Sequence, residues 1–337
     1  MNDTMRVWVY DGPHASHIET RSRPEPGPDD VRIRIAHIGI CGSDLHGYTG
    51  ESGRRVPGMV MGHEASGWIE AMGSAVSGLA VGDAVTFNPA LPCDGSCGHD
   101  VENQCARLRV IGVTPEIQGA FADAIVVQAV RAVRLGEMST EWGAGIEPMA
   151  VALQTSRRAG VAAGASVLVI GGGMIGQCVA QAARLDGATE VVVSDAMAER
   201  REVATAAGFR TVAPEDVENL SHFDIAIDAV GISATAAAAI RAVGKGATVC
   251  FVGLGTPEVT VPLFDIVVSE RQIVGSFCYT HEVFRDAVSH IAAGRLDLGV
   301  LIGSQEPFED IGTTFEALAS GARRDVKIMI STGATAP

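Results

Sequence analysis

The feature that most restricts the fold is a glycine-rich turn that directly follows a short apolar run near the middle of the chain. The run, residues 166–170, reads Ser-Val-Leu-Val-Ile, and residues 171–176 read Gly-Gly-Gly-Met-Ile-Gly. In a G-x-G-x-x-G turn the first glycine makes the bend, the second admits a pyrophosphate and the third lets a helix pack on the strand. The pattern predicts the strand, turn and helix of a dinucleotide-binding domain.

The residues after the turn extend this domain. A helix is expected from Gln177 to Leu185, and a second buried strand over residues 190–194 ends at Asp195. An acidic residue about 20 positions beyond the glycine turn binds the hydroxyls of the adenosine ribose. Its carboxylate would repel a 2′-phosphate, which favours NAD over NADP, although the nearby Arg200 and Arg201 weaken this preference. Arg200 is expected to frame the adenine pocket or to pair with Asp195.

Further strand and helix units complete a parallel sheet. Strands are expected at 223–228 and 248–253, with an alanine-rich helix over 233–243 between them. Ligands of such sheets bind at the carboxyl ends of the strands. The residues predicted to contact the cofactor are Gly171, Gly173, Gly176, Met174, Ile175, Asp195, Arg200, Val230 and Gly253.

A second constellation lies in the first quarter of the chain, in two short motifs. Residues 39–46 read Gly-Ile-Cys-Gly-Ser-Asp-Leu-His, and residues 62–64 read Gly-His-Glu. They place a thiol, an imidazole and a carboxylate in an otherwise apolar region, and sulfur, nitrogen and oxygen are the atoms that zinc prefers. A lone cysteine or histidine is more often an ordinary core or surface residue, but the spacing and the second motif favour a metal site.

Two carboxylates near this site have competing interpretations. Glu64 could ligate the zinc directly, replace water on it during turnover, or lie behind the metal. A distant carboxylate, Glu147, could complete the ligand set, but it also begins an expected helix, where the helix dipole stabilises a negative charge. Zinc catalysis needs three protein ligands and one open position, which these residues could supply together with Cys41 and His63.

Taken together, the motifs resemble those of the zinc-dependent medium-chain dehydrogenases of the alcohol dehydrogenase superfamily, in particular the sorbitol (polyol) dehydrogenase branch. The resemblance covers nearly the whole chain and includes Gly-Asp-x-Val at 82–85 and Glu-Pro-Met at 147–149. It implies an α/β fold of two domains. A GroES-like β-rich catalytic domain would comprise residues 1–150 and 271–337, and a Rossmann domain, a doubly wound parallel sheet that binds NAD, would comprise residues 151–270.

The resemblance also implies a reaction. A catalytic zinc would be held by Cys41, His63 and Glu147, with Glu64 as a further candidate, and a secondary alcohol would be oxidised reversibly to a ketone while NAD takes the hydride. A polyol, cyclitol or sugar-like alcohol is the leading substrate, and an amino alcohol of the threonine type or a simple secondary alcohol is the alternative. A zinc-free quinone reductase of the same superfamily would lack the three ligands.

Three residues beside the zinc ligands are given roles by the same resemblance. Ser43 would hydrogen-bond the substrate oxygen, and His46 would end a proton relay that runs through the cofactor ribose. Asp44 would orient His63, as carboxylates behind metal ligands commonly do. A protein that only senses a dinucleotide would have no need of the relay.

A cysteine-rich segment departs from the family pattern. Family members with a structural zinc carry four cysteines, with two, two and seven residues between them, whereas this chain has only Cys93, Cys97 and Cys105. The last two match the final interval, Cys93 is one residue out of register, and one cysteine is missing. Asp94 or His99 could supply a fourth ligand; the alternative is a loop that has lost its metal. A zinc here would brace a lobe and take no part in the chemistry.

Composition limits the partners. The 337 residues allow two domains, and the formal net charge of −15 repels nucleic acid and anionic membranes. No apolar stretch approaches the roughly 18 residues of a membrane-spanning helix, and the first residues do not resemble a signal peptide. The seven cysteines, three of them clustered, favour reduced thiols and hence a cytoplasmic protein. A small-molecule substrate is expected, and the resemblance implies a homotetramer or homodimer.

Overall fold

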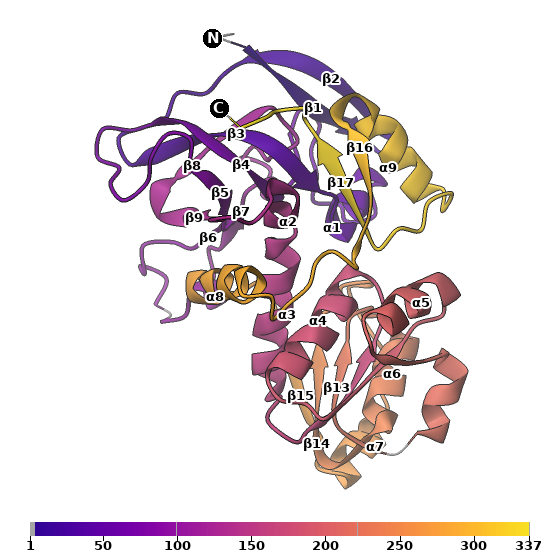
Figure 1. The fold of residues 1–337 in the computed structure, drawn as a ribbon. Helices are drawn as coiled ribbons and strands as arrows, with labels where there is room; N and C mark the ends of the chain where they lie inside the picture. The colour runs from indigo at the N-terminus through magenta and orange to yellow at the C-terminus, as the bar shows by residue number, and fades with distance from the viewer. Residues whose placement is uncertain (1–3, 99, 221, 337) are drawn as a thin grey trace. The chain divides into compact units, whose positions relative to one another are not determined.

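The computed structural model describes residues 4–98, 100–220 and 222–336, which form two compact units (Figure 1). Unit 1 comprises the residues up to Glu147, then Thr280–Ala292, and the residues from Ile302 onward. Unit 2 comprises Pro148–Tyr279 and Ala293–Leu301. Among the described residues, no helix combines the length and the apolar character that a membrane crossing requires.

Unit 1 is built on a mixed seven-stranded sheet with small ribbons and short helices around it. The order of the main sheet is β16 (Ile302–Pro307), β17 (Lys327–Ser331), β3 (Asp30–Gly39), β4 (Glu64–Met72), β5 (Ala84–Phe87) and β9 (Ala132–Arg134), with β8 (Ala124–Gln128) also paired to β3. The two-stranded sheets are β1 (Thr4–Gly12) with β2 (Ala15–Ser22), and β6 (Ala90–Leu91) with β7 (Arg109–Val110). The helices are α1 (Gly42–Tyr48), α2 (Thr140–Ala144), α8 (His281–Ala292) and α9 (Ile311–Ala319), with 3-10 turns η1 (Glu102–Gln104), η2 (Ala129–Arg131) and η4 (Phe308–Asp310).

The core of unit 1 follows from the alternating pattern of its strands. In β3 the apolar residues Val31, Ile33 and Ile35 are fully buried and alternate with more exposed polar residues, as one-sided burial of a strand requires. An aromatic cluster extends this core, since the ring of Trp8 stacks on Phe315 with centroids 4.5 Å apart.

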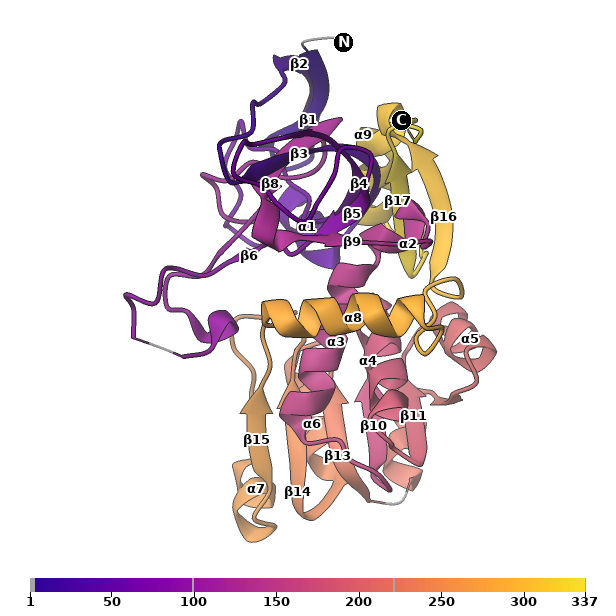
Figure 2. The same cartoon turned by 60° about the vertical axis from the view of Figure 1, so that its left-hand side comes forward.

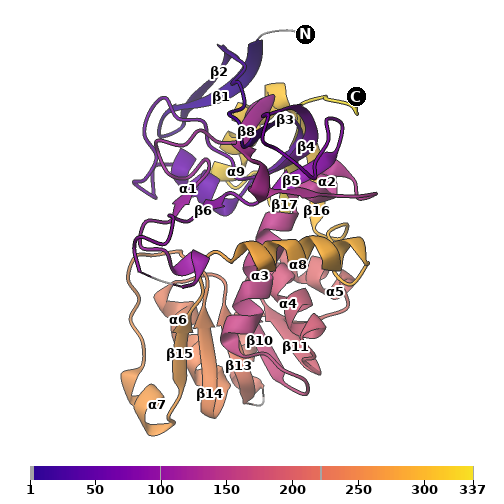
Figure 3. The same cartoon turned by 90° about the vertical axis from the view of Figure 1, so that its left-hand side faces the viewer.

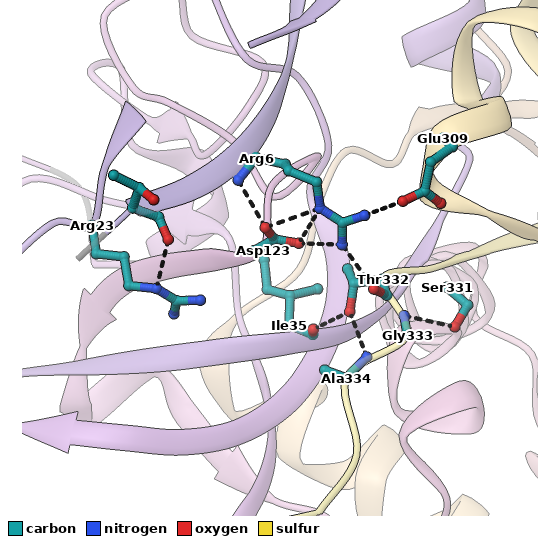
Figure 4. Close-up of polar contacts among 10 residues, drawn as sticks. Arg6, Arg23, Ile35, Asp123, Glu309, Ser331, Thr332, Gly333 and Ala334 are labelled. Atoms are coloured by element: carbon teal, nitrogen blue, oxygen red, sulfur yellow. Dashed lines mark hydrogen bonds and ion pairs between the residues drawn. The ribbon is translucent and has the colours of Figure 1, made fainter. Parts of the chain in front are cut away.

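The C-terminal segment is tied into unit 1 by polar contacts (Figure 4). The Arg6 guanidinium donates to the Asp123 carboxylate (Nη2 to Oδ1, 2.7 Å) and to the Thr332 carbonyl (2.8 Å), and it also pairs with Glu309. The Thr332 hydroxyl donates to the Ile35 carbonyl at 2.6 Å. These bonds fasten the C-terminal end of β17, which ends just before Thr332, beside β3; the metal-site motifs lie at the other end of this strand pair, where Lys327 begins β17.

Unit 2 is a parallel six-stranded sheet with helices packed along it, which confirms the expected α/β class (Figure 2). The strand order is β12 (Arg210–Val212), β11 (Glu190–Ser194), β10 (Ser166–Ile170), β13 (Phe223–Asp228), β14 (Val243–Phe251) and β15 (Gln272–Gly275). Its helical elements are α4 (Met174–Leu185), α5 (Ala198–Ala206), η3 (Pro214–Asn219), α6 (Ser233–Ala242) and α7 (Leu263–Val268), and α3 (Ile146–Ala159) leads in from unit 1. The central strands β10 and β13 are buried apart from Ser166 and Asp224 near their starts, as a sheet covered on both faces requires.

One strand differs from the sequence-based expectation. The residues from 271 onward were expected to belong to the first domain, but residues 272–275 form β15, which pairs in parallel with β14 from Thr248↔Gln272 to Phe251↔Gly275. The free edge of β14 supplies backbone partners for this segment, so the chain stays in unit 2 until Tyr279. Figure 3 shows β15 at the end of this sheet, with α7 at its foot.

Candidate metal site and cofactor edge

The mixed sheet of unit 1 brings three distant segments to one place. Glu64, the first residue of β4, pairs with Gly39, the last residue of β3, and on the other side of β3 the same Gly39 pairs with Met329 of β17. Cys41 follows β3 by two residues and Lys327 begins β17. The register of these strands therefore sets Cys41, Glu64 and Lys327 at the same edge of the sheet.

Cys41, His63 and Glu64 converge at this edge. One sulfur, nitrogen or oxygen atom from each lies within 4.8 Å of the others. His63 and Glu64 are buried and Cys41 is half-buried. The Oε1 atom of Glu64 is buried without a hydrogen-bond partner, which is costly unless another group meets it.

Asp44 lies behind His63 and is fully buried. Its Oδ2 accepts a hydrogen bond from the backbone N–H of Cys41 at 3.3 Å, which closes the first turn of α1, and its Oδ1 lies 3.6 Å from Nδ1 of His63. Burial lowers the pKa of His63, but the Asp44 carboxylate and the Cys41 sulfur raise it by more, so this pKa lies well above its ordinary value. The surroundings of His63 favour positive charge, whether from a proton or from a metal cation.

Lys327 holds the second oxygen of Glu64. Its buried Nζ donates to Oε2 of Glu64 at 2.5 Å and to the Ile40 carbonyl at 2.9 Å. Burial lowers the pKa of Lys327, but the charge of Glu64, and further those of Cys41 and Glu147, raise it above its ordinary value. The lysine thus stays charged and leaves only Oε1 of Glu64 to face the metal.

The other predicted residues of the site lie on short helices. Glu147 is buried in the first turn of α3; it is not a member of the trio of converging ligands, but its charge acts on Lys327. Ser43 donates to Cys41 (Oγ to Sγ, 3.3 Å) and is exposed, as is His46. Ser43 and His46 are three positions apart on α1 and therefore share one helix face.

These residues fit a zinc ion. The donor set of sulfur, nitrogen and oxygen matches the preference of zinc, and the unpartnered Oε1 of Glu64 is available to it. Asp44 stands behind His63 in the manner of a carboxylate that orients a metal ligand. We therefore treat Cys41, His63 and Glu64 as the candidate ligands, with Glu147 on the same side of the sheet.

The cysteine-rich loop gathers its three thiols. The Sγ of Cys97 lies 2.8 Å from that of Cys93 and 3.6 Å from that of Cys105, and the Cys93 N–H donates to the Cys105 sulfur at 3.2 Å. The hydrogen bond with Cys97 lowers the pKa of Cys93 to about 6. Asp94 is not a member of this group, and His99 lies outside the described residues.

In unit 2 the parallel register lines up the strand ends. Ile170 of β10 pairs with Ser194 of β11 and with Asp228 of β13, and Asp228 pairs with Phe251 of β14. The segments that follow these four residues therefore emerge at one edge of the sheet. The carboxyl edge of such a sheet is where dinucleotides bind.

The glycine turn at this edge leaves no room for side chains. Gly171 has a φ of 99°, and a Cβ on Gly176 would lie 1.7 Å from the carbonyl oxygen of Gly171. Gly173 caps α4, so Met174 and Ile175 form its first turn. The N-terminus of a helix attracts a phosphate group, which suits the turn for a pyrophosphate.

Asp195 is buried beside this turn. Its Oδ2 accepts from the Gly172 N–H and its Oδ1 from the Met197 N–H, both at 2.7 Å. Arg200 places Nη1 3.6 Å from Oδ2 of Asp195, whereas Arg201 donates to the Asp195 backbone carbonyl at 2.7 Å. The carboxylate thus fixes the glycine turn, and Arg200 pairs with it.

Two loops at the same edge are clamped by Asp228. Its carboxylate accepts from the N–H groups of Val230 (2.8 Å) and Gly231 (3.0 Å), and its backbone carbonyl accepts from Gly253 at 3.0 Å. The predicted cofactor residues Val230 and Gly253 are therefore held next to each other.

Sequence reasoning missed several residues that shape these two sites: Arg55, Gln177, Asp228 and Lys327. A signal existed for Asp228 and Lys327, because a charged residue within an apolar strand needs a buried partner. Gln177 donates to the carbonyls of Gly172 (3.0 Å) and Arg200 (2.9 Å), and nothing in its local sequence predicts these contacts.

Comparisons with known proteins agree with this architecture. Residues 27–137 match the family model described as alcohol dehydrogenase GroES-like domain, and residues 174–293 match the one described as zinc-binding dehydrogenase. The chain is 32% identical to D-xylulose reductase A of Aspergillus niger, over 96% of both chains. It is 34% identical to sorbitol dehydrogenase of Gallus gallus, over 93% of this chain and 92% of the relative.

A solved structure shares the whole fold. A dehydrogenase of Sinorhizobium meliloti 1021, crystallised with NADP bound, superposes with a TM-score of 0.89 at 30% identity, and the match covers 97% of this chain and 99% of the other. The sequence matches and the common fold together show that the chain belongs to the zinc-dependent medium-chain dehydrogenase family, in its polyol dehydrogenase branch.

Proposed function

We propose that this protein oxidises a secondary alcohol of the polyol, cyclitol or sugar-like class to the ketone, reversibly, with zinc and NAD. The observation that carries the proposal is the buried trio of Cys41, His63 and Glu64, in a chain that also carries the glycine turn of a dinucleotide-binding sheet. When bound, zinc supplies Lewis acidity at an alcohol oxygen and NAD supplies the hydride acceptor.

The chain's own residues hold the metal and move the proton. Cys41, His63 and Glu64 would bind zinc, and Glu147, whose charge acts on Lys327, is the further candidate that the family resemblance implies. The exposed hydroxyl of Ser43, next to the Cys41 sulfur, would accept the proton of the substrate hydroxyl as it passes its own proton on, and the exposed His46 would release a proton to solvent.

Asp195 supports NAD as the preferred cofactor. The carboxylate is buried at the edge of the sheet, beside the glycine turn, where it would face the adenosine ribose. A 2′-phosphate would meet its negative charge. The S. meliloti relative was solved with NADP, so the ratio of the two cofactors is a measurement that this chain needs for itself.

The polyol class rests on the relatives. Two of them are named for the reduction of xylulose and the oxidation of sorbitol, which are reactions of sugar alcohols and their ketoses. Several vicinal hydroxyls on the substrate would suit Ser43, Glu147 and His46, because each of these side chains can hydrogen-bond an alcohol.

The test is NAD reduction by the purified zinc-loaded protein on a panel of polyols, cyclitols, amino alcohols and simple secondary alcohols. We expect turnover on the polyol or cyclitol group, loss of turnover after chelation and its return with zinc. Cys41→Ser should lose both turnover and one zinc. Chelator-resistant turnover, or full activity of the Cys41→Ser variant, would refute the zinc mechanism, and turnover confined to amino alcohols would move the substrate to the threonine-type class.

We further propose that the enzyme is a homodimer or homotetramer of the cytoplasm. Large apolar side chains are exposed on α7 in unit 2, with Phe264 76% and Leu263 67% exposed, and such a surface is stabilised when another molecule covers it. Among the described residues no disulfide joins any of the cysteines, which suits a reducing compartment.

A further inference from the structure

We propose that Arg55 is a positioning residue for the metal site, which holds Asp44, and through it His63, in the orientation that binds zinc. The inference rests on the proposed function in one respect, that zinc binds at His63. Nothing in the local sequence marks Arg55, since it is the second of two adjacent arginines in a polar loop.

Arg55 is buried although it lies in a loop, whereas its neighbour Arg54 is exposed. Each nitrogen of its guanidinium has a partner. Nε contacts the Met61 sulfur at 3.3 Å, Nη1 donates to the Val113 carbonyl at 3.2 Å, and Nη2 donates to the Ser43 carbonyl at 3.4 Å. A guanidinium with its donors fixed in this way holds its charge at one place.

That place is beside Asp44. Nη2 of Arg55 lies 3.8 Å from Oδ1 of Asp44, and the same Oδ1 lies 3.6 Å from Nδ1 of His63. Oδ1 of Asp44 and Nδ1 of His63 are both buried, and neither has a conventional hydrogen-bond partner. One carboxylate oxygen thus stands between two cationic groups, and its position decides where the imidazole is directed.

A buried carboxylate needs this second cation once zinc is bound. A histidine that ligates zinc is the neutral imidazole, so His63 no longer supplies a full charge to Asp44 in the metal-bound protein. Arg55 remains charged in both conditions, because a guanidinium keeps its proton. Arg55 would therefore hold the Asp44 carboxylate in place while His63 serves the metal, since an unpaired buried charge is strongly unfavourable.

The chain makes room for this arginine at Gly47 of α1. A Cβ on Gly47 would lie 2.7 Å from Cγ and 2.9 Å from Nε of Arg55, and neither atom is at the flexible end of the side chain. Arg55 therefore crosses the helix at the one position where a glycine leaves it space. Tyr10 also lies near enough for the charge of Arg55 to act on its phenol, and among the described residues Asp44 is the carboxylate within ion-pair distance of Arg55.

The test is the zinc affinity of the folded protein, measured by competition with a chromophoric chelator, in Arg55→Met and Arg55→Lys variants. Arg55→Met keeps the stem that packs on Met61 and removes the charge. We expect Arg55→Met to bind zinc at the catalytic site roughly 10- to 100-fold more weakly, as loss of a partner behind a metal ligand does elsewhere. Arg55→Lys should recover part of that loss, and the exposed Arg54→Met should show none.

A double-mutant cycle shows whether Arg55 acts through Asp44. Asp44→Asn should also weaken zinc binding, and adding Arg55→Met to it should cost little more, because the carboxylate that Arg55 holds is gone. Independent, multiplying losses would overturn the proposal. So would an Arg55→Met variant whose melting temperature falls while its zinc affinity stays that of the wild type, because that result assigns the arginine to stability alone.

A further variant keeps the charge of Arg55 but shifts the position of its guanidinium. Gly47→Ala should displace Arg55 and weaken zinc binding in the same direction, and it provides the answer if Arg55→Met does not fold. If the Gly47→Ala variant and the Arg55→Lys variant each bind zinc as tightly as the wild type does, the positioning role is contradicted. A wild-type protein that binds no zinc at Cys41 and His63 would instead refute the proposed function, and this inference with it.

Discussion

The side chain of Asp195 has two roles, so the effects of replacing it must be interpreted with both in mind. The carboxylate fixes the glycine turn through Gly172 and Met197, and by its charge it would exclude a 2′-phosphate from the same edge. Arg200 lies 3.6 Å away and would be released to meet a phosphate if the carboxylate were removed. A change at this residue therefore alters both the order of the turn and the choice of cofactor.

We expect Asp195→Ala to shift the ratio of kcat/KM for NAD over NADP towards NADP by roughly 10- to 100-fold, because like-charge repulsion of a few kcal/mol is lost. The ratio is the proper readout, since disorder of the turn would weaken both cofactors alike. Glu202→Gln is the control, because it removes an exposed charge from α5, the helix that carries Arg200, and it should leave the ratio unchanged. An unaltered ratio in Asp195→Ala would take this residue out of cofactor selection.

At the scale of elements, the sequence predicted individual strands, because their apolar pattern is local. It did not predict which strands pair with each other. The apolar runs that became β10, β11 and β13 were recognisable. That Lys327 meets Glu64, 263 positions earlier in the chain, depends on β17 pairing with β3 and β3 with β4. No local pattern contains that register, so the sequence predicted the candidate metal ligands but neither Lys327 nor Arg55.

The cysteine-rich loop is an element whose metal the family pattern left open. Its three sulfurs lie within 4.8 Å of one another, and a backbone N–H already donates to the Cys105 sulfur, a bond that stabilises a thiolate. Three thiolates so close together repel one another unless a cation lies among them. We therefore predict that this loop binds a zinc that is separate from the catalytic one.

Cys97→Ser tests this, since Cys97 lies between the other two sulfurs. We expect it to lose about one zinc equivalent per chain and to lower the melting temperature by several degrees, while the zinc that Cys41 binds and most of the turnover remain. Cys250→Ser, in the core of unit 2, is the matched control and should keep the full zinc content. Zinc content in Cys97→Ser equal to that of the wild type would show that the loop has lost its metal.

At the scale of the whole molecule, the sequence alone predicted the class of fold and the residues of two candidate sites. It did not predict the position at which the chain returns to the first domain. The glycine turn and the Cys, His and Glu motifs are chemical requirements, so they are visible in single residues. The segment at Ile273 is ambiguous because a short apolar strand can pair with either sheet, and the available edge of β14 decided it. The sequence likewise did not predict which surface covers the outer edge of β15.

The exposed apolar residues around that edge lead to a prediction about assembly. Leu263, Phe264, Val267 and Val268 of α7 are each more than half exposed, and α7 adjoins β15, the unpaired edge of the six-stranded sheet (Figure 3). An apolar surface beside an open strand edge is the kind that a second copy of the chain covers.

Phe264→Glu should weaken self-association by roughly 30-fold or more, because burial of a charge replaces burial of a large aromatic ring at the centre of the contact. Sedimentation velocity over a range of concentrations would show a shift towards smaller species. Val130→Glu, at an equally exposed apolar residue of unit 1, is the control and should leave the assembly as it is. If the Phe264→Glu protein sediments as the wild type does, the contact between copies lies elsewhere, and α7 must be covered by something other than this chain.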